Sequence, residues 1–147
     1  MLNLNLPSYD PKVRRRNNKI EIFDPIRKKY ILLTPEEWVR QHFVNYLVRH
    51  MHYPRSLIRM ESGLKYNSLQ KRSDILVYNR LGIPFMLVEC KAAEVKLNQK
   101  VVEQIAVYNH IISAPYMVIT NGITHYCYKK NQEDRSFEHL RDLPAFV

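Results

Sequence analysis

The sequence predicts an α+β domain in which a β-hairpin and a helix precede three strands, a second helix and two more strands. The prediction rests on short β-rich runs bounded by turn residues, and on two longer segments with helical spacing of apolar residues. The chain has 147 residues, of which 46% are hydrophobic, so its size and composition suit one compact domain. We expect an extended basic arm over residues 1–18 and a single domain over residues 19–147.

The N-terminal arm contains two prolines and the run Arg14-Arg15-Arg16. These arginines could contact phosphates, although a solvated basic segment needs no partner. Two β-rich runs follow, at 19–23 and 29–33. Because they flank a turn centred on Asp24-Pro25, they predict a β-hairpin.

The first helix is predicted to begin after Thr34, the N-cap of a capping box completed by Glu37. Pro35 occupies the first helical position, where proline is favoured. The helix is expected to run to about residue 51, before Pro54. Its apolar side consists of Val39, Phe43, Tyr46 and Leu47.

The second half of the chain alternates strand patterns with one helical pattern. Strands predicted at 56–67 and 72–79 would pair through a turn at 68–71. The remaining predicted elements are a strand at 85–91, a helix at about 97–113, and strands at 115–120 and 123–129 joined by the tight turn Asn121-Gly122. No element is predicted for the tail, residues 131–147.

The charge balance points to an anionic partner. Lys and Arg number 23 against 14 Asp and Glu, a formal net charge of +9. Nucleic acid is the commonest partner for such a surplus, and simple solubility is the alternative explanation. Cys90 and Cys127 form no C-x-x-C pair, which suits reduced thiols in a cytoplasmic protein. No signal peptide or apolar run long enough to span a membrane is visible, so we expect a cytoplasmic protein.

Charged residues stand at the end of an apolar strand in PFMLVECKA, residues 84–92. Alternation places Glu89 and Lys91 on one face of this strand, and places Asp74 on a face with apolar side chains of the preceding strand. If the strands pair, the three charged groups can converge at one end of the sheet. Two converging carboxylates suit Mg²⁺ or Mn²⁺, and a metal-bound water beside a lysine suits phosphodiester hydrolysis. The alternative is a structural ion pair of Lys91 with Asp74 or Glu89.

The second helix adds a column of polar side chains. Lys100, Gln104 and Tyr108 are four residues apart, so they share one helix face. Such a column could meet a phosphate backbone, or it could be an ordinary amphipathic boundary.

An ordered set of motifs runs along the chain. The set is Asp74, LVECKA with Glu89 and Lys91, Q-x-x-x-Y at Gln104 and Tyr108, and VITNG at 118–122. Over about residues 30–130 it resembles the PD-(D/E)xK nuclease superfamily, and within it the N-terminal nuclease domain of type I restriction enzyme R subunits. TPEEWVRQ also resembles the start of the first helix in small stand-alone bacterial members. The resemblance implies a restriction-endonuclease-like core, a central mixed sheet flanked by helices.

The resemblance also implies Mg²⁺- or Mn²⁺-dependent cleavage of DNA and assigns roles to the motif residues. Asp74, Glu89 and the backbone carbonyl of Cys90 would hold the metal, with Glu37 or Glu36 as a further ligand. Lys91 would act on the attacking water. Gln104 and Tyr108 would orient the helix or the DNA. Candidate DNA-binding residues are Lys100, Lys71, Arg72, Arg14, Arg15 and Arg16.

The chain departs from the family pattern in two respects. Ser73 stands where the family motif has proline, a change that many members tolerate. No P-loop G-x-x-x-x-G-K-[ST] occurs, so this chain is not expected to translocate DNA by itself. A restriction or helicase protein is therefore a candidate partner. Double-strand cutting would suit a homodimer, for which no interface pattern is visible.

Two other functions are compatible with the residues. One is a nucleic-acid-binding module that keeps the nuclease fold and does not cut. The other is a structural or interaction protein whose charged residues form ion pairs. Metal binding and salt-dependent DNA affinity distinguish these alternatives from a nuclease.

Overall fold

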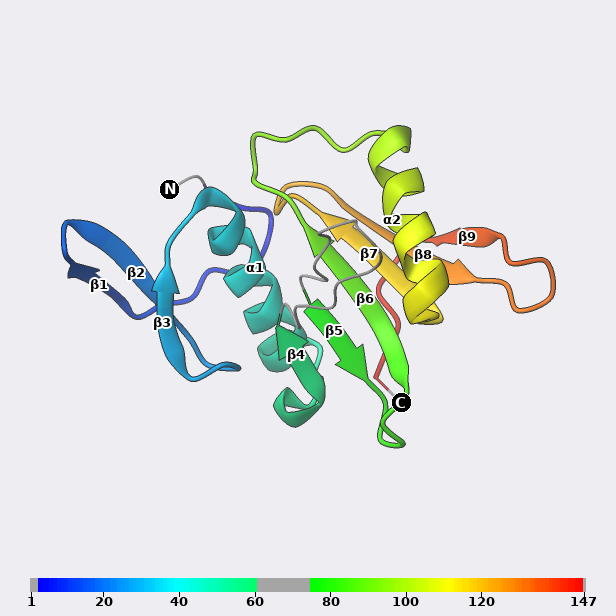
Figure 1. Ribbon diagram of the computed structural model, residues 1–147, viewed down its shortest axis with the longest axis horizontal. Helices are drawn as coiled ribbons and strands as arrows, with labels where there is room; N and C mark the ends of the chain where they lie inside the picture. The colour runs from blue at the N-terminus through cyan, green and yellow to red at the C-terminus, as the bar shows by residue number, and fades with distance from the viewer. Residues whose placement is uncertain (1–2, 61–74, 147) are drawn as a thin grey trace.

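The computed structural model describes residues 3–60 and 75–146. Within these residues the chain forms two sheets and two α-helices, which confirms the expected mixed α/β architecture (Figure 1). A six-stranded mixed sheet forms the body. A three-stranded sheet built from the N-terminal part projects at one end of the molecule.

The large sheet has the strand order β4-β5-β6-β7-β8-β9. All neighbours are antiparallel except β6 and β7, which run parallel. Helix α2 lies between these two strands in the chain, because a parallel pair needs a crossover connection. The strands are β4 (Ile58–Met60), β5 (Ile75–Tyr78), β6 (Pro84–Cys90), β7 (Tyr116–Thr120), β8 (His125–Lys130) and β9 (Phe137–Leu140).

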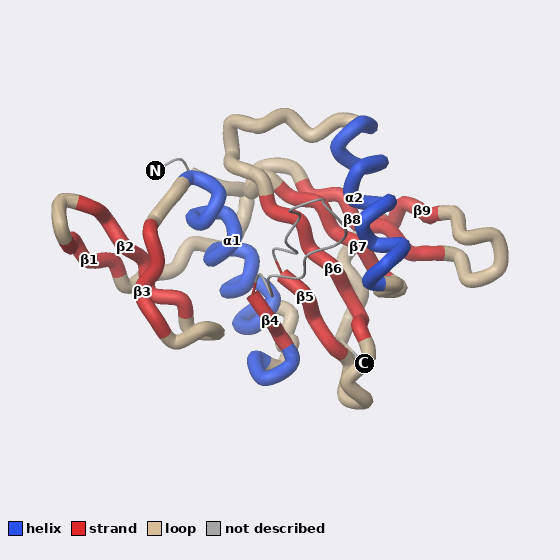
Figure 2. The backbone as a smooth tube through the Cα atoms, in the orientation of Figure 1, coloured by secondary structure: helices blue, strands red, loops and turns tan. Residues whose placement is uncertain are grey.

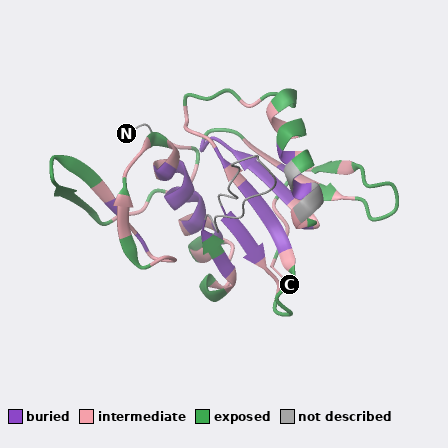
Figure 3. Ribbon diagram, in the orientation of Figure 1, coloured by how far each residue is buried: buried purple, intermediate pink, exposed green. Residues whose placement is uncertain are grey.

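The two faces of this sheet support separate core clusters, and each face is covered by one helix (Figures 2 and 3). On one face, Val77, Met86 and Val88 pack with the apolar side of α1. On the other, Leu76, Leu87 and Met117 pack with α2. The alternation of side chains along β5 and β6 explains this division.

Helix α1 (Pro35–Asn45) begins as predicted, since the Thr34 side chain accepts a hydrogen bond of 3.0 Å from the Glu37 backbone N–H. The expected helix to about residue 51 continues as a π-helical turn, Tyr46–His50. There the N–H of Met51 donates to the carbonyl of Tyr46. A 3₁₀ turn, Arg55–Leu57, follows Pro54.

The small sheet contains one strand more than the expected hairpin. β2 (Lys19–Asp24) and β3 (Lys29–Leu32) form that hairpin. A further strand, β1 (Val13–Arg16), pairs with β2 and lies inside the segment expected to be an extended basic arm. Asn17 and Asn18 adopt φ of 51° and 62°. Such positive values are those of a type I′ turn, which joins paired strands tightly. Residues 13–16 of the expected extended arm are therefore paired in a sheet, because Asn17-Asn18 forms a hairpin turn.

Helix α2 (Gln99–Ile112) begins at Asn98, whose side chain accepts a hydrogen bond of 3.0 Å from the Val101 N–H. It ends where the buried Asn109 side chain bonds to both backbone groups of Ala114. The unassigned tail contributes β9, which pairs with β8. Among the described residues, no helix is long and apolar enough to cross a membrane.

Candidate active site

The central strand β6 presents Glu89 at its end. Phe85, Met86, Leu87 and Val88 are buried, and neighbours on both sides hold the strand. Glu89 alternates with Val88 and Cys90, which are buried on the α1 face, and so belongs to the face covered by α2. Its side chain is 13% exposed. The strand thus holds a largely buried carboxylate in a defined position.

Lys91 directly follows β6 and lies beside Glu89. Its backbone N–H donates to the carbonyl of Thr120 at 2.8 Å, which extends the parallel pairing of β6 and β7 by one residue. Its Nζ lies 3.7 Å from Glu89 Oε1, and its side chain is 31% exposed. This separation is an ion-pair distance and exceeds that of a hydrogen bond. The structure therefore brings together the glutamate and lysine of the E-x-K motif.

The end of β7 stiffens the surroundings of Lys91. The Asn121 side chain donates to the carbonyl of Val95 at 2.8 Å, and so attaches the loop after Lys91 to the β7–β8 turn. Its Oδ1 accepts hydrogen bonds from the N–H groups of Ile123 and Thr124. Thr120 Oγ1 accepts one from the N–H of Gly122. The end of the VITNG segment thus helps to position the loop after Lys91, a contact that its turn and motif signals did not predict.

Helix α2 covers the same face of the sheet as Glu89. Lys100 and Gln104 are exposed on it, while its apolar side packs on Leu87 and Met117. Tyr108 lies within the helix, and its side chain is outside the described set. Lys100 and Gln104 are therefore accessible to a large anionic ligand.

The first carboxylate of the motif falls outside the described residues. Asp74, together with Lys71 and Arg72, lies in the segment 61–74 that the structure does not describe. The described pairing of β5 with β6 ends at Ile75 and Val88, one residue before Asp74 is reached. The roles predicted for Asp74, Lys71 and Arg72 therefore stay predictions.

Glu37 lies at the other face, in an ion-pair network on α1. Its Oε1 bonds to Arg40 Nη1, and its Oε2 accepts a hydrogen bond of 2.9 Å from Gln41 Nε2. Arg27 Nη2 lies 3.7 Å from the same Oε2. Glu36 also binds Arg40, at 2.7 Å. Both carboxylates therefore have cationic partners within the fold, and the metal role of Glu37 or Glu36 stays a prediction.

Arg14, Arg15 and Arg16 lie on the exposed strand β1. Arg14 is engaged within the small sheet, because its Nε binds Glu21 at 2.8 Å and its guanidinium stacks 3.9 Å from the ring centre of Tyr30. Arg15 and Arg16 flank the hairpin turn and are exposed. These two side chains are available to a partner.

The described residues contain no cluster of three or more His, Cys, Asp or Glu side chains that could hold a metal ion. At the end of β6 they supply the carboxylate of Glu89, whose hard oxygen atoms fit Mg²⁺ or Mn²⁺. Cys90 and Cys127 are buried free thiols, and burial raises the pKa of Cys127 to about 11. A thiolate metal site is therefore not favoured at Cys127.

In a comparison with protein families, the chain matches the family described as Type I restriction enzyme R protein N terminus (HSDR_N). It covers residues 35–144, from the start of α1 to beyond β9. The comparison with curated proteins gave no match.

Proposed function

Because the chain belongs to the family of type I restriction enzyme R protein N-termini, we propose that it is a metal-dependent deoxyribonuclease. The observation that supports this function best is the pair Glu89 and Lys91 at the end of β6. A buried central strand holds this pair, and α2 covers the same face. Such support is what a preorganised catalytic group requires.

In this proposal, Glu89 and Asp74 hold Mg²⁺ or Mn²⁺, with the backbone carbonyl of Cys90 as a further ligand. Ile75, which follows Asp74 in the chain, pairs with Val88, which precedes Glu89. This register favours a common site for the two carboxylates. The metal would supply a water of lowered pKa and neutralise charge on the phosphate.

Lys91 has the charge and position to stabilise the negative charge that develops on the phosphate, or to orient the attacking water. Its partial exposure leaves the ammonium accessible to substrate. On the helix, Gln104 and Lys100 would contact the DNA backbone beside the site, with Tyr108 on the same helical column. DNA is thus the proposed substrate, and a restriction or helicase protein remains the proposed partner.

The decisive experiment is plasmid cleavage by the purified chain in Mg²⁺ or Mn²⁺ at low salt, with an EDTA control. Lys91→Ala should lower the cleavage rate by about 100-fold or more, because a group acting in the transition state is lost. Its affinity for DNA, measured by fluorescence anisotropy, should change little because one charge is a small part of the surplus.

Lys96→Ala is the matched control, because Lys96 is exposed and lies five residues further along the same loop. It should cut like the wild type. Equal cleavage by Lys91→Ala and the wild type would refute the assigned site.

The second candidate function is a nucleic-acid-binding module that does not cut. The 3.7 Å ion pair between Lys91 and Glu89 favours this binding module, because such a pair can be purely structural. Calorimetry with Mn²⁺ separates the two functions. The nuclease requires a divalent site that Glu89→Gln weakens, whereas the binding module requires none.

A further inference from the structure

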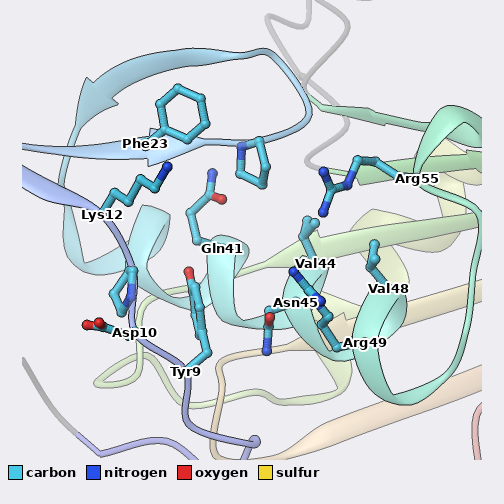
Figure 4. Close-up of a pocket in the computed structure, with 12 residues that line it drawn as sticks. Tyr9, Asp10, Lys12, Phe23, Gln41, Val44, Asn45, Val48, Arg49 and Arg55 are labelled. Carbon is cyan, nitrogen blue, oxygen red and sulfur yellow. The ribbon is translucent and has the colours of Figure 1, made fainter.

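A pocket of about 290 Å³ lies on the α1 side of the molecule, where the N-terminal segment meets β2, α1 and the π-helical turn (Figure 4). Helix α1 packs on the face of the large sheet opposite to Glu89. The pocket therefore does not belong to the candidate active site. All the residues that line it are described by the structure.

The wall of the pocket is mainly apolar and includes two aromatic rings. It is formed by Tyr9, Pro11, Phe23, Pro25, Val44 and Val48. The ring of Phe23 is half-buried and makes an edge contact with Tyr30, 5.3 Å between ring centres. An aromatic wall of this kind offers a flat π-surface on which another ring can stack.

Amide groups and a tyrosine hydroxyl add polar contacts. Gln41 is buried, and its Nε2 is committed to Glu37, which fixes the side chain in place. Asn45 lies one helical turn further on and also lines the pocket. Burial and the nearby Asp24 and Glu37 carboxylates raise the pKa of Tyr9, so its hydroxyl stays protonated.

The rim of the pocket is cationic. Lys12, Arg49 and Arg55 line it together with one carboxylate, Asp10. Lys12 Nζ lies 5.6 Å from the ring centre of Phe23. Arg49 and Arg55 are exposed, and the described part of the chain provides neither side chain with an ion-pair partner. Among the described residues, three cations and one carboxylate therefore line the pocket, which leaves its rim with a net positive charge.

A second hollow, of about 390 Å³, adjoins the pocket and is also lined by cationic side chains. It shares Pro25 and Arg55 with the pocket and adds Lys28 and Arg59. Arg59 is held by hydrogen bonds from Nη1 to the carbonyls of Ser56 and Ile58. Arg55 therefore lies between two hollows that are both lined by cations. A nucleic acid strand bound in one hollow could place its next phosphate in the other.

We propose that the pocket binds a nucleotide, with its base against the ring of Phe23 and its phosphate at Arg49 and Arg55. The volume lies near the lower end of the roughly 300–1,000 Å³ range of ligand pockets, which suits a ligand of this size. Aromatic stacking with cations along the backbone is how proteins hold single-stranded nucleic acid. The ligand is either a free nucleotide or one nucleotide of a single strand. In the second case Lys28 and Arg59 contact the adjoining phosphates.

The test is a titration of the ¹⁵N-labelled full chain followed by NMR in EDTA, where no metal-dependent cleavage can occur. The probes are dAMP, deoxyadenosine, inorganic phosphate and a short oligothymidylate. Amide shifts on nucleotide addition should cluster at residues 9–12, 23–25 and 41–49. The double variant Arg49→Ala/Arg55→Ala should weaken nucleotide binding by about tenfold, because two charge contacts are lost. Phe23→Leu should weaken it by about fivefold or more through lost stacking.

Lys129→Ala/Arg141→Ala is the matched control, since it removes the same charge from exposed positions outside the pocket. It should bind like the wild type. Binding of dAMP alone identifies a free nucleotide, and tighter binding of the oligothymidylate identifies single-stranded nucleic acid. Equal affinity for inorganic phosphate and dAMP, or equal weakening by the control, would overturn the proposal. Because EDTA is present throughout, these outcomes are independent of whether the chain is a nuclease.

Discussion

Glu89 and Lys91 show how a charged pair can be tolerated at the end of a core strand. Glu89 is largely buried beside a cation, so its charge is partly compensated where an isolated carboxylate would be costly. Lys91 is more exposed and is held through its backbone by Thr120. Glu89 is therefore held in place, while the Lys91 ammonium stays accessible. The proposed reaction requires both, because Glu89 would hold the metal and Lys91 would act on the substrate.

Two histidines, the buried His42 and the half-buried His125, make the stability of the fold depend on pH. His125 Nε2 contacts the carbonyl of Asn5 at 3.0 Å, so this nitrogen carries the proton, and Nδ1 faces the Thr120 hydroxyl at 2.7 Å. His42 Nδ1 contacts the carbonyl of Trp38. Burial lowers the pKa of both histidines from 6.5, although the backbone hydrogen bonds oppose the effect.

We expect the protein to lose stability as the pH falls below about 6.5. Below that value the unfolded histidines take up protons while the folded ones, with lowered pKa, resist, so protonation favours unfolding. The stabilisation that the two neutral histidines provide is fully present above the pKa of histidine in the unfolded chain. It declines as the pH falls, until the lowered pKa of the folded state is passed. This loss of stability is measured as the change in the urea unfolding midpoint between neutral and mildly acidic pH. The variant His42→Gln/His125→Gln should lose most of the dependence. An unchanged wild-type midpoint would contradict the expectation.

At the scale of elements, the β7–β8 turn connects three parts of the fold. Gly122 accepts a backbone hydrogen bond of 2.7 Å from Asn5, and the adjacent Asn121 holds the loop after Lys91. A Cβ placed on Gly122 would lie 2.8 Å from Leu4 Cδ2 and 3.2 Å from Val39 Cγ2. Leu4 and helix α1 therefore pack against this turn so closely that a side chain at position 122 would require Leu4 to move.

Gly122→Ala should destabilise the protein by about 2 kcal/mol or more, because it combines a positive φ of 85° with steric overlap. Gly82→Ala is the matched control, since Gly82 has a similar φ of 78° and an added Cβ there would have no neighbour within 4 Å. This variant should lose only about 1 kcal/mol of stability, the cost of placing a residue with a Cβ at a positive φ. Urea unfolding measures both values. Equal losses in the two variants would show that packing at Gly122 contributes nothing.

At the scale of the whole molecule, exposed cations lie at both ends. The β1–β2 hairpin stands at one end, and the β8–β9 loop lies at the other (Figure 1). The hairpin tip exposes Arg15, Arg16 and Lys19. Arg14 is already occupied by Glu21 and Tyr30. The tip therefore offers a compact group of cations to a large anionic partner.

We expect affinity for duplex DNA to fall steeply with salt, because bound cations release counterions. Replacing Arg15, Arg16 and Lys19 by Ala should weaken binding and reduce the slope of log K against log salt by up to about 3, roughly 0.9 per lost phosphate contact. The control replaces Lys129, Arg135 and Arg141, which are exposed around β8 and β9, away from the hairpin. Anisotropy titrations at several salt concentrations measure the slope. The same reduction in both variants would show that only net charge matters.

The local signals of the sequence predicted much of this fold. The Thr34 cap, the apolar run of β6 and the Asn121-Gly122 turn lie where they were expected. The strand β1 and the tail strand β9 were not predicted. Strand β1 is exposed throughout, so no hydrophobic pattern marks it, and its hydrogen bonds come from pairing with β2. Strand β9 has only four residues, and its two half-buried apolar residues, Phe137 and Leu140, pack against different core clusters, so they show no alternation that would predict a strand.

What the sequence by itself determined is the order of the elements and the choice of charged residues, because capping, periodicity and turn chemistry act over a few residues. What only the tertiary structure decided is which of these residues meet. It placed Arg27 within 3.7 Å of Glu37, and it joined the Asn121 side chain to the carbonyl of Val95. It also formed a cation-rimmed pocket from segments as distant in the chain as Tyr9 and Arg55. Such contacts depend on sheet register and helix docking, which long-range packing sets and which local patterns do not encode.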